Sequence, residues 1–161
     1  LIGGFMLKRG VALHDPNKSI VSRVIHACTK SAAYHCELLF SDSKSLIVTP
    51  KYLGIGFKSY NFYNWTLVPI PGIDEETEID IREKCESILA KKPKYDYLGA
   101  ISGFFGSKKE NSDKWFCSEL IAYLLKPYIP TLDTDKWMTP DRLWKLLSDR
   151  INNIYYYYMN N

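Results

Sequence analysis

Apolar residues recur at helical spacing in several stretches of the chain, which places them on one face of a helix. The clearest stretch is 74–92, where acidic residues come first, lysines occupy the last turn as the helix dipole favours, and Pro93 follows. A further helix is predicted from Thr139 and Pro140 to about Asp149, with Thr139 as its N-cap. The same spacing predicts helices over 19–29, 97–105 and 116–125.

Short apolar runs bounded by turn residues predict the strands of a sheet. Residues 34–40 and 45–49 flank the polar turn 41–43, so they are expected to form a hairpin. Gly54 and Gly56 mark a segment that is expected to be irregular. Further strands are predicted within 3–13, over 64–70 and over the Tyr-rich tail 151–159.

The order of these elements is typical of a single α+β domain over residues 1–161, with an antiparallel sheet packed against helices. Of the 161 residues, 46% are hydrophobic, which is enough for one core, and no apolar run reaches the length of a transmembrane helix. The net charge is +3 and no Lys/Arg block dominates, so nothing favours nucleic-acid binding. Residues 1–6 look like the start of a strand rather than a signal peptide, so we expect a soluble protein. The compartment and the oligomeric state stay open.

Cys117 is the candidate nucleophile, because it joins a polar loop to an apolar predicted helix. A thiol in the first turn of a helix meets exposed N–H groups and the positive end of the dipole, which lower its pKa. The same N–H groups can receive an oxyanion when the thiolate attacks a carbonyl. A buried structural cysteine is the alternative. The remaining cysteines show no Cys-x-x-Cys spacing and are expected to be buried hydrophobic residues: Cys28, Cys36 and Cys85.

His35 is the candidate base for that thiolate. On the predicted strand 34–40, alternation places His35 and Glu37 on one face. A thiolate enzyme needs an imidazole within hydrogen-bond reach, and it gains from a third group that fixes the tautomer. Glu37 is the candidate for this third group, and a structural role in the sheet or a contact with a substrate ammonium is the alternative. The other two histidines rank lower, since they lie in a turn and inside a predicted helix: His14 and His26.

Three short motifs follow one another along the chain: Ser31–Leu38 (SAAYHCEL), Tyr95–Gly99 (YDYLG) and Trp115–Leu120 (WFCSEL). In this order they resemble the circularly permuted branch of the NlpC-type papain-like cysteine hydrolases. That branch includes the YiiX-like group and is related to the lecithin retinol acyltransferase-like proteins. In the family, the first motif carries the catalytic histidine and the third carries the nucleophile. The resemblance covers roughly residues 5 to 127 and implies that His35 is the base and Cys117 the nucleophile.

The resemblance also implies acyl transfer to Cys117 and hydrolysis of the resulting thioester, with no cofactor and no metal. It leaves the third catalytic group open. Relatives often draw a polar group from the strand after the histidine, and here that strand offers only Ser45 and Thr49, so Glu37 is preferred and Thr49 is the fallback. Three tyrosines are candidates for lining the substrate cleft or binding the oxyanion, with aromatic packing as the alternative: Tyr34, Tyr95 and Tyr97.

The substrate is less closely determined, because the resembled family acts on amides and on lipid esters. We expect an amide, as in a peptide or a cell-wall peptide. A lipid ester hydrolase or an acyltransferase of the retinol-acyltransferase type is the second hypothesis. A non-catalytic binding module that keeps the fold is the third, and a separation of His35 and Cys117 far beyond hydrogen-bond reach would favour it.

Overall fold

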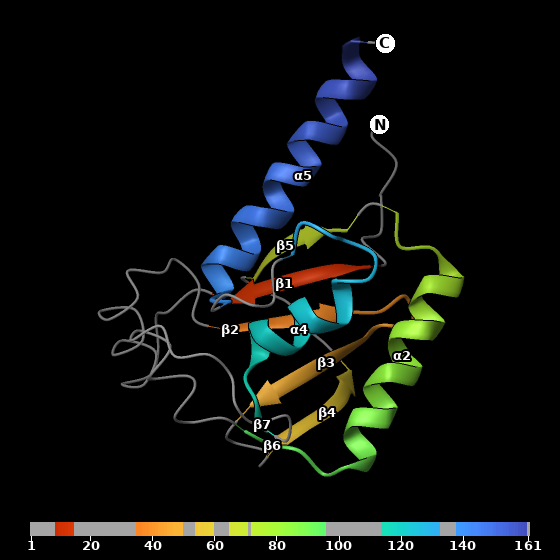
Figure 1. Ribbon diagram of the computed structural model, residues 1–161, viewed down its shortest axis with the longest axis vertical. Coiled ribbons are helices and arrows are strands. Elements are labelled where there is room, and N and C mark those ends of the chain that lie inside the picture. Colours follow the sequence, from red (N-terminus) through yellow and green to blue (C-terminus); the bar gives the residue numbers. More distant parts are fainter. Residues whose placement is uncertain are drawn as a thin grey trace.

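The computed structural model describes residues 9–14, 35–49, 54–59, 65–70, 72–95, 114–132 and 138–160. Within these ranges a five-stranded antiparallel sheet packs against helices, which confirms the predicted α+β class (Figure 1). The helices predicted over 19–29 and 97–105 lie outside the described residues. In the described part of the chain, no helix is both long and apolar enough to cross a membrane.

The strand order in the sheet is β4-β3-β2-β1-β5, and each neighbouring pair is antiparallel. β2 therefore lies in the middle of the sheet, and it forms the predicted hairpin with β3. A second, two-residue pairing of β6 with β7 is parallel and leads the chain to Cys117. The strands are β1 (Gly10–His14), β2 (His35–Leu39), β3 (Lys44–Thr49), β4 (Gly54–Ser59), β5 (Trp65–Pro69), β6 (Lys94–Tyr95) and β7 (Lys114–Trp115).

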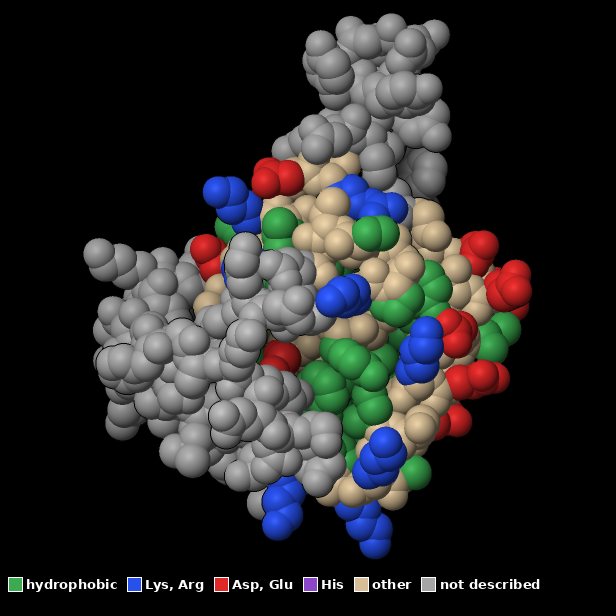
Figure 2. Space-filling model, in the orientation of Figure 1, with side chains coloured by type: hydrophobic (Ala, Val, Ile, Leu, Met, Phe, Trp, Pro, Cys, Tyr) green, Lys and Arg blue, Asp and Glu red, His purple; other side chains and the backbone are tan. Residues whose placement is uncertain are grey.

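The helices are α2 (Glu75–Ala90), α4 (Cys117–Leu125) and α5 (Pro140–Asn160). α4 crosses β2 and β3, and α2 runs along the edge of the body, where Figure 2 shows acidic side chains gathered. The predicted N-cap at Thr139 is present, and Asp74, expected in the first turn, is itself the N-cap of α2. The side chain of Asp74 accepts a hydrogen bond from the Thr77 N–H at 2.8 Å, and that of Thr139 accepts one from the Arg142 N–H at 3.1 Å.

The main hydrophobic core lies between α4 and one face of the sheet. Alternate strand residues supply it, which is the pattern expected of a strand with one face buried against helices. Glu37 and Ser45 have the opposite parity, so they point to the other face, where they are nevertheless buried. The core residues from the three central strands, and from the position directly after β2, are Val11, Leu13, Cys36, Leu38, Phe40, Leu46 and Val48.

Two predictions about elements are wrong. The segment with Gly54 and Gly56 is not irregular but forms β4, which pairs with β3 along six residues, Lys44–Thr49. Glycine fits position 54, because a Cβ there would lie at a tight 3.2 Å from the carbonyl oxygen of Pro93. The tail 151–159 is not a strand but continues α5 to Asn160, since extending an existing helix costs less than starting a new element.

Candidate active site

Cys117 is the first residue of α4 and is 4% exposed. The N-cap residue, Phe116, has a side chain that cannot accept a hydrogen bond, so no capping side chain takes up the N–H groups of the first turn. The helix start is held in place by Ser118, whose buried hydroxyl donates a hydrogen bond to the Met138 carbonyl at 2.7 Å. The thiol therefore lies at the positive end of an anchored helix, as the sequence predicts.

The Cys117 thiol is hydrogen-bonded to His35 and to Cys36, both on β2. The hydrogen bond from Cys36 and the charge and hydrogen bond of His35 overcome the opposing effect of burial, and they hold the pKa of Cys117 well below its usual range. Burial lowers the pKa of His35, but Cys117 and Glu37 outweigh it and raise that pKa to about 9. These two shifts both favour the thiolate and imidazolium form of the pair.

Glu37 faces the imidazole from the same strand. Nε2 of His35 lies 3.5 Å from Oε1 of Glu37, which leaves Nδ1 as the nitrogen for the thiol. The Ser45 hydroxyl donates to Oε2 at 2.7 Å, and Nζ of Lys58 lies 2.7 Å from Oε1. Burial raises the pKa of Glu37, but the hydrogen bonds from His35, Lys58 and Ser45 lower it by more than burial raises it. The pKa therefore lies below its ordinary value.

The position of His35 at the start of β2 explains how it reaches both partners. Alternation directs Glu37 to one face of the sheet and Cys36 to the helix face. His35 is the first residue of the strand, so its ring lies at the end of the sheet and contacts Glu37 on one side and Cys117 on the other. The three predicted catalytic residues are thus brought together from one strand and one helix start.

Two residues that sequence reasoning missed complete this cluster. The Trp65 ring packs edge-on against His35 with centroids 6.0 Å apart, and Nζ of Lys58 lies 6.0 Å from the Trp65 ring centroid. Lys58 lies on β4 and Trp65 on β5, the two edge strands of the sheet. In a flat sheet these strands would be separated by four spacings of about 4.8 Å, or about 19 Å. The sheet therefore curls over Glu37. Recognition of β4 as a strand would have placed Lys58 on the face of Glu37 by alternation.

Cys36 was expected to be a buried hydrophobic residue, and it is fully buried. Its thiol also donates to Cys117, which the burial argument did not anticipate. Burial and this neighbour raise the pKa of Cys36 well above its usual range. Cys85 is buried on α2, where burial raises its pKa to about 12. Cys117 and Cys85 thus differ sharply in acidity, although both are buried.

The structure describes the other candidate residues only in part or not at all. Tyr34, Tyr97 and Cys28 lie outside the described residues. Tyr95 belongs to β6 and Thr49 ends β3, but the description of both is limited to their backbone. Glu37 is the third group that the structure places against His35.

The chain was compared with known proteins. A scan against protein-family models finds no match, and a search of the curated proteins finds none either. The interpretation of the site therefore depends on its geometry and on the motifs in the sequence.

Proposed function

We propose that the protein is a cysteine hydrolase in which Cys117 is the nucleophile and His35 the general base. One observation carries the proposal: the Cys117 thiol is hydrogen-bonded to His35, whose other nitrogen faces the buried carboxylate of Glu37. A cysteine that only fills the core needs no imidazole and no helix start. The non-catalytic alternative required a wide separation of His35 and Cys117, and the hydrogen bond between them argues against it.

The proposed reaction follows from this geometry. The Cys117 thiolate attacks a carbonyl carbon, and the oxyanion that forms is stabilised by N–H groups at the start of α4. The imidazolium of His35 gives its proton to the leaving amine as the C–N bond breaks, which leaves a thioester on Cys117. Neutral His35 then takes a proton from water. The resulting hydroxide equivalent displaces the thiolate, the acid is released, and the starting ion pair is restored.

The amide class of substrate rests on the sequence motifs. The motif around His35, the Tyr-Asp-Tyr stretch at 95–97 and the motif around Cys117 resemble permuted NlpC-type hydrolases. We propose that the chain shares their permuted arrangement, in which the histidine strand precedes the cysteine helix, and their action on a peptide or cell-wall peptide amide. A lipid ester is the alternative substrate of the same site.

Alkylation by iodoacetamide over a range of pH tests the nucleophile. We expect Cys117 to react at pH 6, where an ordinary thiol with a pKa of about 8.5 is almost entirely protonated. His35→Ala removes this early reactivity, because the thiolate loses its cationic partner. Cys85→Ala is the matched control, since it deletes another buried thiol and leaves the reaction at pH 6 unchanged. The proposal would be overturned if peptide mapping showed that iodoacetamide alkylates all the cysteines equally slowly.

Turnover of two small probes separates the substrate classes. An acyl p-nitroanilide is a model amide, and a long-chain p-nitrophenyl ester is a model lipid ester. We expect turnover of the anilide that Cys117→Ser abolishes. Turnover of the ester alone would keep the hydrolase and overturn the amide assignment.

A further inference from the structure

The carboxylate of Glu37 is shared unequally between two cations. Oε1 lies 2.7 Å from Nζ of Lys58 and 3.5 Å from Nε2 of His35, so the closer partner is the lysine. The Glu37 side chain is 1% exposed, whereas that of Lys58 is 39% exposed. A buried carboxylate is costly unless a cation or hydrogen bonds compensate it. Lys58 is thus the cation closest to Glu37 and supports its charge together with the hydrogen bond from His35.

The groups around Glu37 come from several strands. β3 presents the Ser45 hydroxyl to Oε2. On β1, the residue paired with Glu37 is Ala12, which carries no charge. Among the described side chains, the cations against the carboxylate are therefore His35 and Lys58, while Cys36 and Cys117 interact with the cluster across the end of β2. When His35 becomes neutral, Lys58 is the cation that remains.

We propose that Lys58 is a positioning residue, whose ammonium keeps Glu37 a carboxylate aimed at His35 when the imidazole is neutral. Its catalytic meaning rests on the proposed hydrolase function. In the acyl-enzyme, Cys117 carries no charge and His35 has given its proton to the leaving group. Without Lys58, Glu37 would keep only the Ser45 hydroxyl and the Nε2–H of neutral His35 as donors, and its proton affinity would rise. A protonated Glu37 can donate to Nε2 of neutral His35, which favours the Nδ1–H tautomer over the Nε2–H tautomer that activates water.

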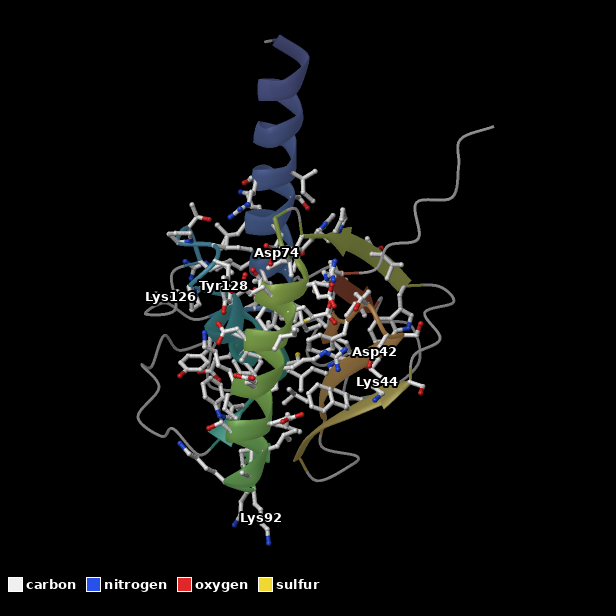
Figure 3. All side chains as sticks on the ribbon, turned by 90° about the vertical axis from the view of Figure 1, so that its right-hand side faces the viewer. Asp42, Lys44, Asp74, Lys92, Lys126 and Tyr128 are labelled. Atoms are coloured by element: carbon white, nitrogen blue, oxygen red, sulfur yellow. The ribbon has the colours of Figure 1, made fainter. Side chains whose placement is uncertain are left out.

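An exposed ion pair of this chain provides the contrast. Asp42 and Lys44 lie together at the hairpin turn, with Nζ 3.6 Å from Oδ2 (Figure 3). Their side chains are 42% and 53% exposed, so water solvates both charges. Such a pair contributes little to the state of its carboxylate. Lys44→Met therefore removes an equivalent lysine at a site where the proposal predicts no effect on Glu37.

The test is carbon-13 NMR of the Glu37 carboxyl in a Cys117→Ala background, which imitates the uncharged nucleophile and needs no reactivity. Glu37→Gln assigns the signal. We expect Lys58→Met to raise the titration midpoint of Glu37 by at least one pH unit, a tenfold gain in proton affinity. Lys58→Arg restores the original midpoint, and Lys44→Met leaves it unchanged. Lys58→Gln replaces Lys58→Met if the latter does not fold.

Nitrogen-15 shifts of His35 provide a second measurement that a merely structural lysine would not alter. Above the pKa of His35, where the imidazole is neutral, we expect the Nε2–H tautomer in the parent and Lys58→Arg proteins. Lys58→Met shifts the population toward Nδ1–H. If the titration midpoint of Glu37 changes by no more than a few tenths of a pH unit in both Lys58→Met and Lys58→Gln, the proposed role of Lys58 is overturned. That result leaves the hydrolase proposal intact, because the iodoacetamide reaction of Cys117 decides it separately.

Discussion

Nε2 of His35 lies 3.5 Å from Oε1 of Glu37, although the residue between them, Cys36, points into the helix-facing core. One strand thus supplies two kinds of support for Cys117. His35 and Glu37 provide charge from the strand end, and Cys36 provides a hydrogen bond from beneath α4. The predictions below separate these contributions.

Glu37→Gln removes the carboxylate charge and keeps the shape of the side chain. Because Glu37 is one of the groups that raise the pKa of His35, the variant should lose its imidazolium at a lower pH than the original value of about 9. Iodoacetate reports this loss, since the anionic reagent is attracted by the imidazolium and its reaction with Cys117 falls when the imidazolium is lost. We expect the upper limb of the rate profile to move down by about one pH unit.

The matched control for Glu37→Gln is Glu76→Gln, an exposed carboxylate in the first turn of α2. It changes the net charge of the protein equally and should leave the profile unchanged. An upper limb that moves in neither variant would show that Glu37 does not act on His35.

Cys36→Ala tests the hydrogen bond to the nucleophile. This bond is the first cause of the low pKa of Cys117, so its loss should raise that pKa. We expect alkylation of Cys117 by iodoacetamide at pH 6 to slow roughly threefold to tenfold, which corresponds to one hydrogen bond of about 1 kcal/mol. The rates should converge above the usual thiol pKa. Slowing of the same size in Cys85→Ala would contradict the assignment, because it would reflect loosened packing.

Local patterns predicted the parts of the fold that local interactions stabilise. The hairpin around 41–43 has its turn chemistry in the sequence, and the helix at 74–92 has its acidic first turn and its stop at Pro93 there. β4 was missed because a glycine-rich strand owes its structure to pairing with β3, which lies earlier in the chain. The C-terminal part of α5 was missed because aromatic residues favour strands only weakly and a preceding helix outweighs them.

The same distinction holds for the site. Cys117 and His35 could be named from the sequence because each stands in a recognisable local setting, and Glu37 follows from strand alternation. Lys58 and Trp65 reach the site through long side chains that extend from the two edge strands over the curled sheet. No pattern within either strand records that curvature.

Glu78 on α2 provides a pH-dependent contribution to stability. It is 5% exposed, and its carboxylate accepts hydrogen bonds from Arg9, from the backbone and hydroxyl of Ser41, and from Arg82. Burial raises the pKa of Glu78, but the hydrogen bonds lower it by more than burial raises it. The pKa in the folded protein therefore lies below the ordinary 4.5. The stabilisation is therefore complete above about pH 5 and is lost as pH falls through the folded pKa.

Glu78→Gln should lower the free energy of unfolding by roughly 2 kcal/mol at pH 7, because it leaves buried and half-buried donors with a weaker acceptor. The difference from the parent protein should shrink below the ordinary value of 4.5. Urea unfolding at several pH values measures both effects, with Glu76→Gln as the exposed control. A difference that stays constant from pH 7 to pH 3 would mean that Glu78 contributes through packing rather than through its charge.

Two glycines of β4 form a matched pair that tests the strand carrying Lys58. A Cβ at Gly54 would lie 3.2 Å from the Pro93 carbonyl oxygen, and Gly54 has φ +159°, whereas a Cβ at Gly56 would meet nothing within 4 Å. We therefore expect Gly54→Ala to destabilise the fold by about 1–3 kcal/mol. Gly56→Ala should be neutral or stabilising by about 0.4–1 kcal/mol, because it restricts the unfolded chain.

Because Gly56 is paired with Ile47, alternation places both on the face of the sheet that carries Glu37 and Lys58. Although it lies on that face, a methyl group at Gly56 meets nothing within 4 Å, so it should leave the ion pair between Lys58 and Glu37 in place, and Cys117 should keep its reactivity at pH 6. Gly54→Ala should reduce that reactivity only as far as it unfolds the protein. Urea unfolding and iodoacetamide labelling of the same samples separate the two effects. Equal destabilisation by both substitutions would show that β4 does not pack against Pro93 as the structure has it.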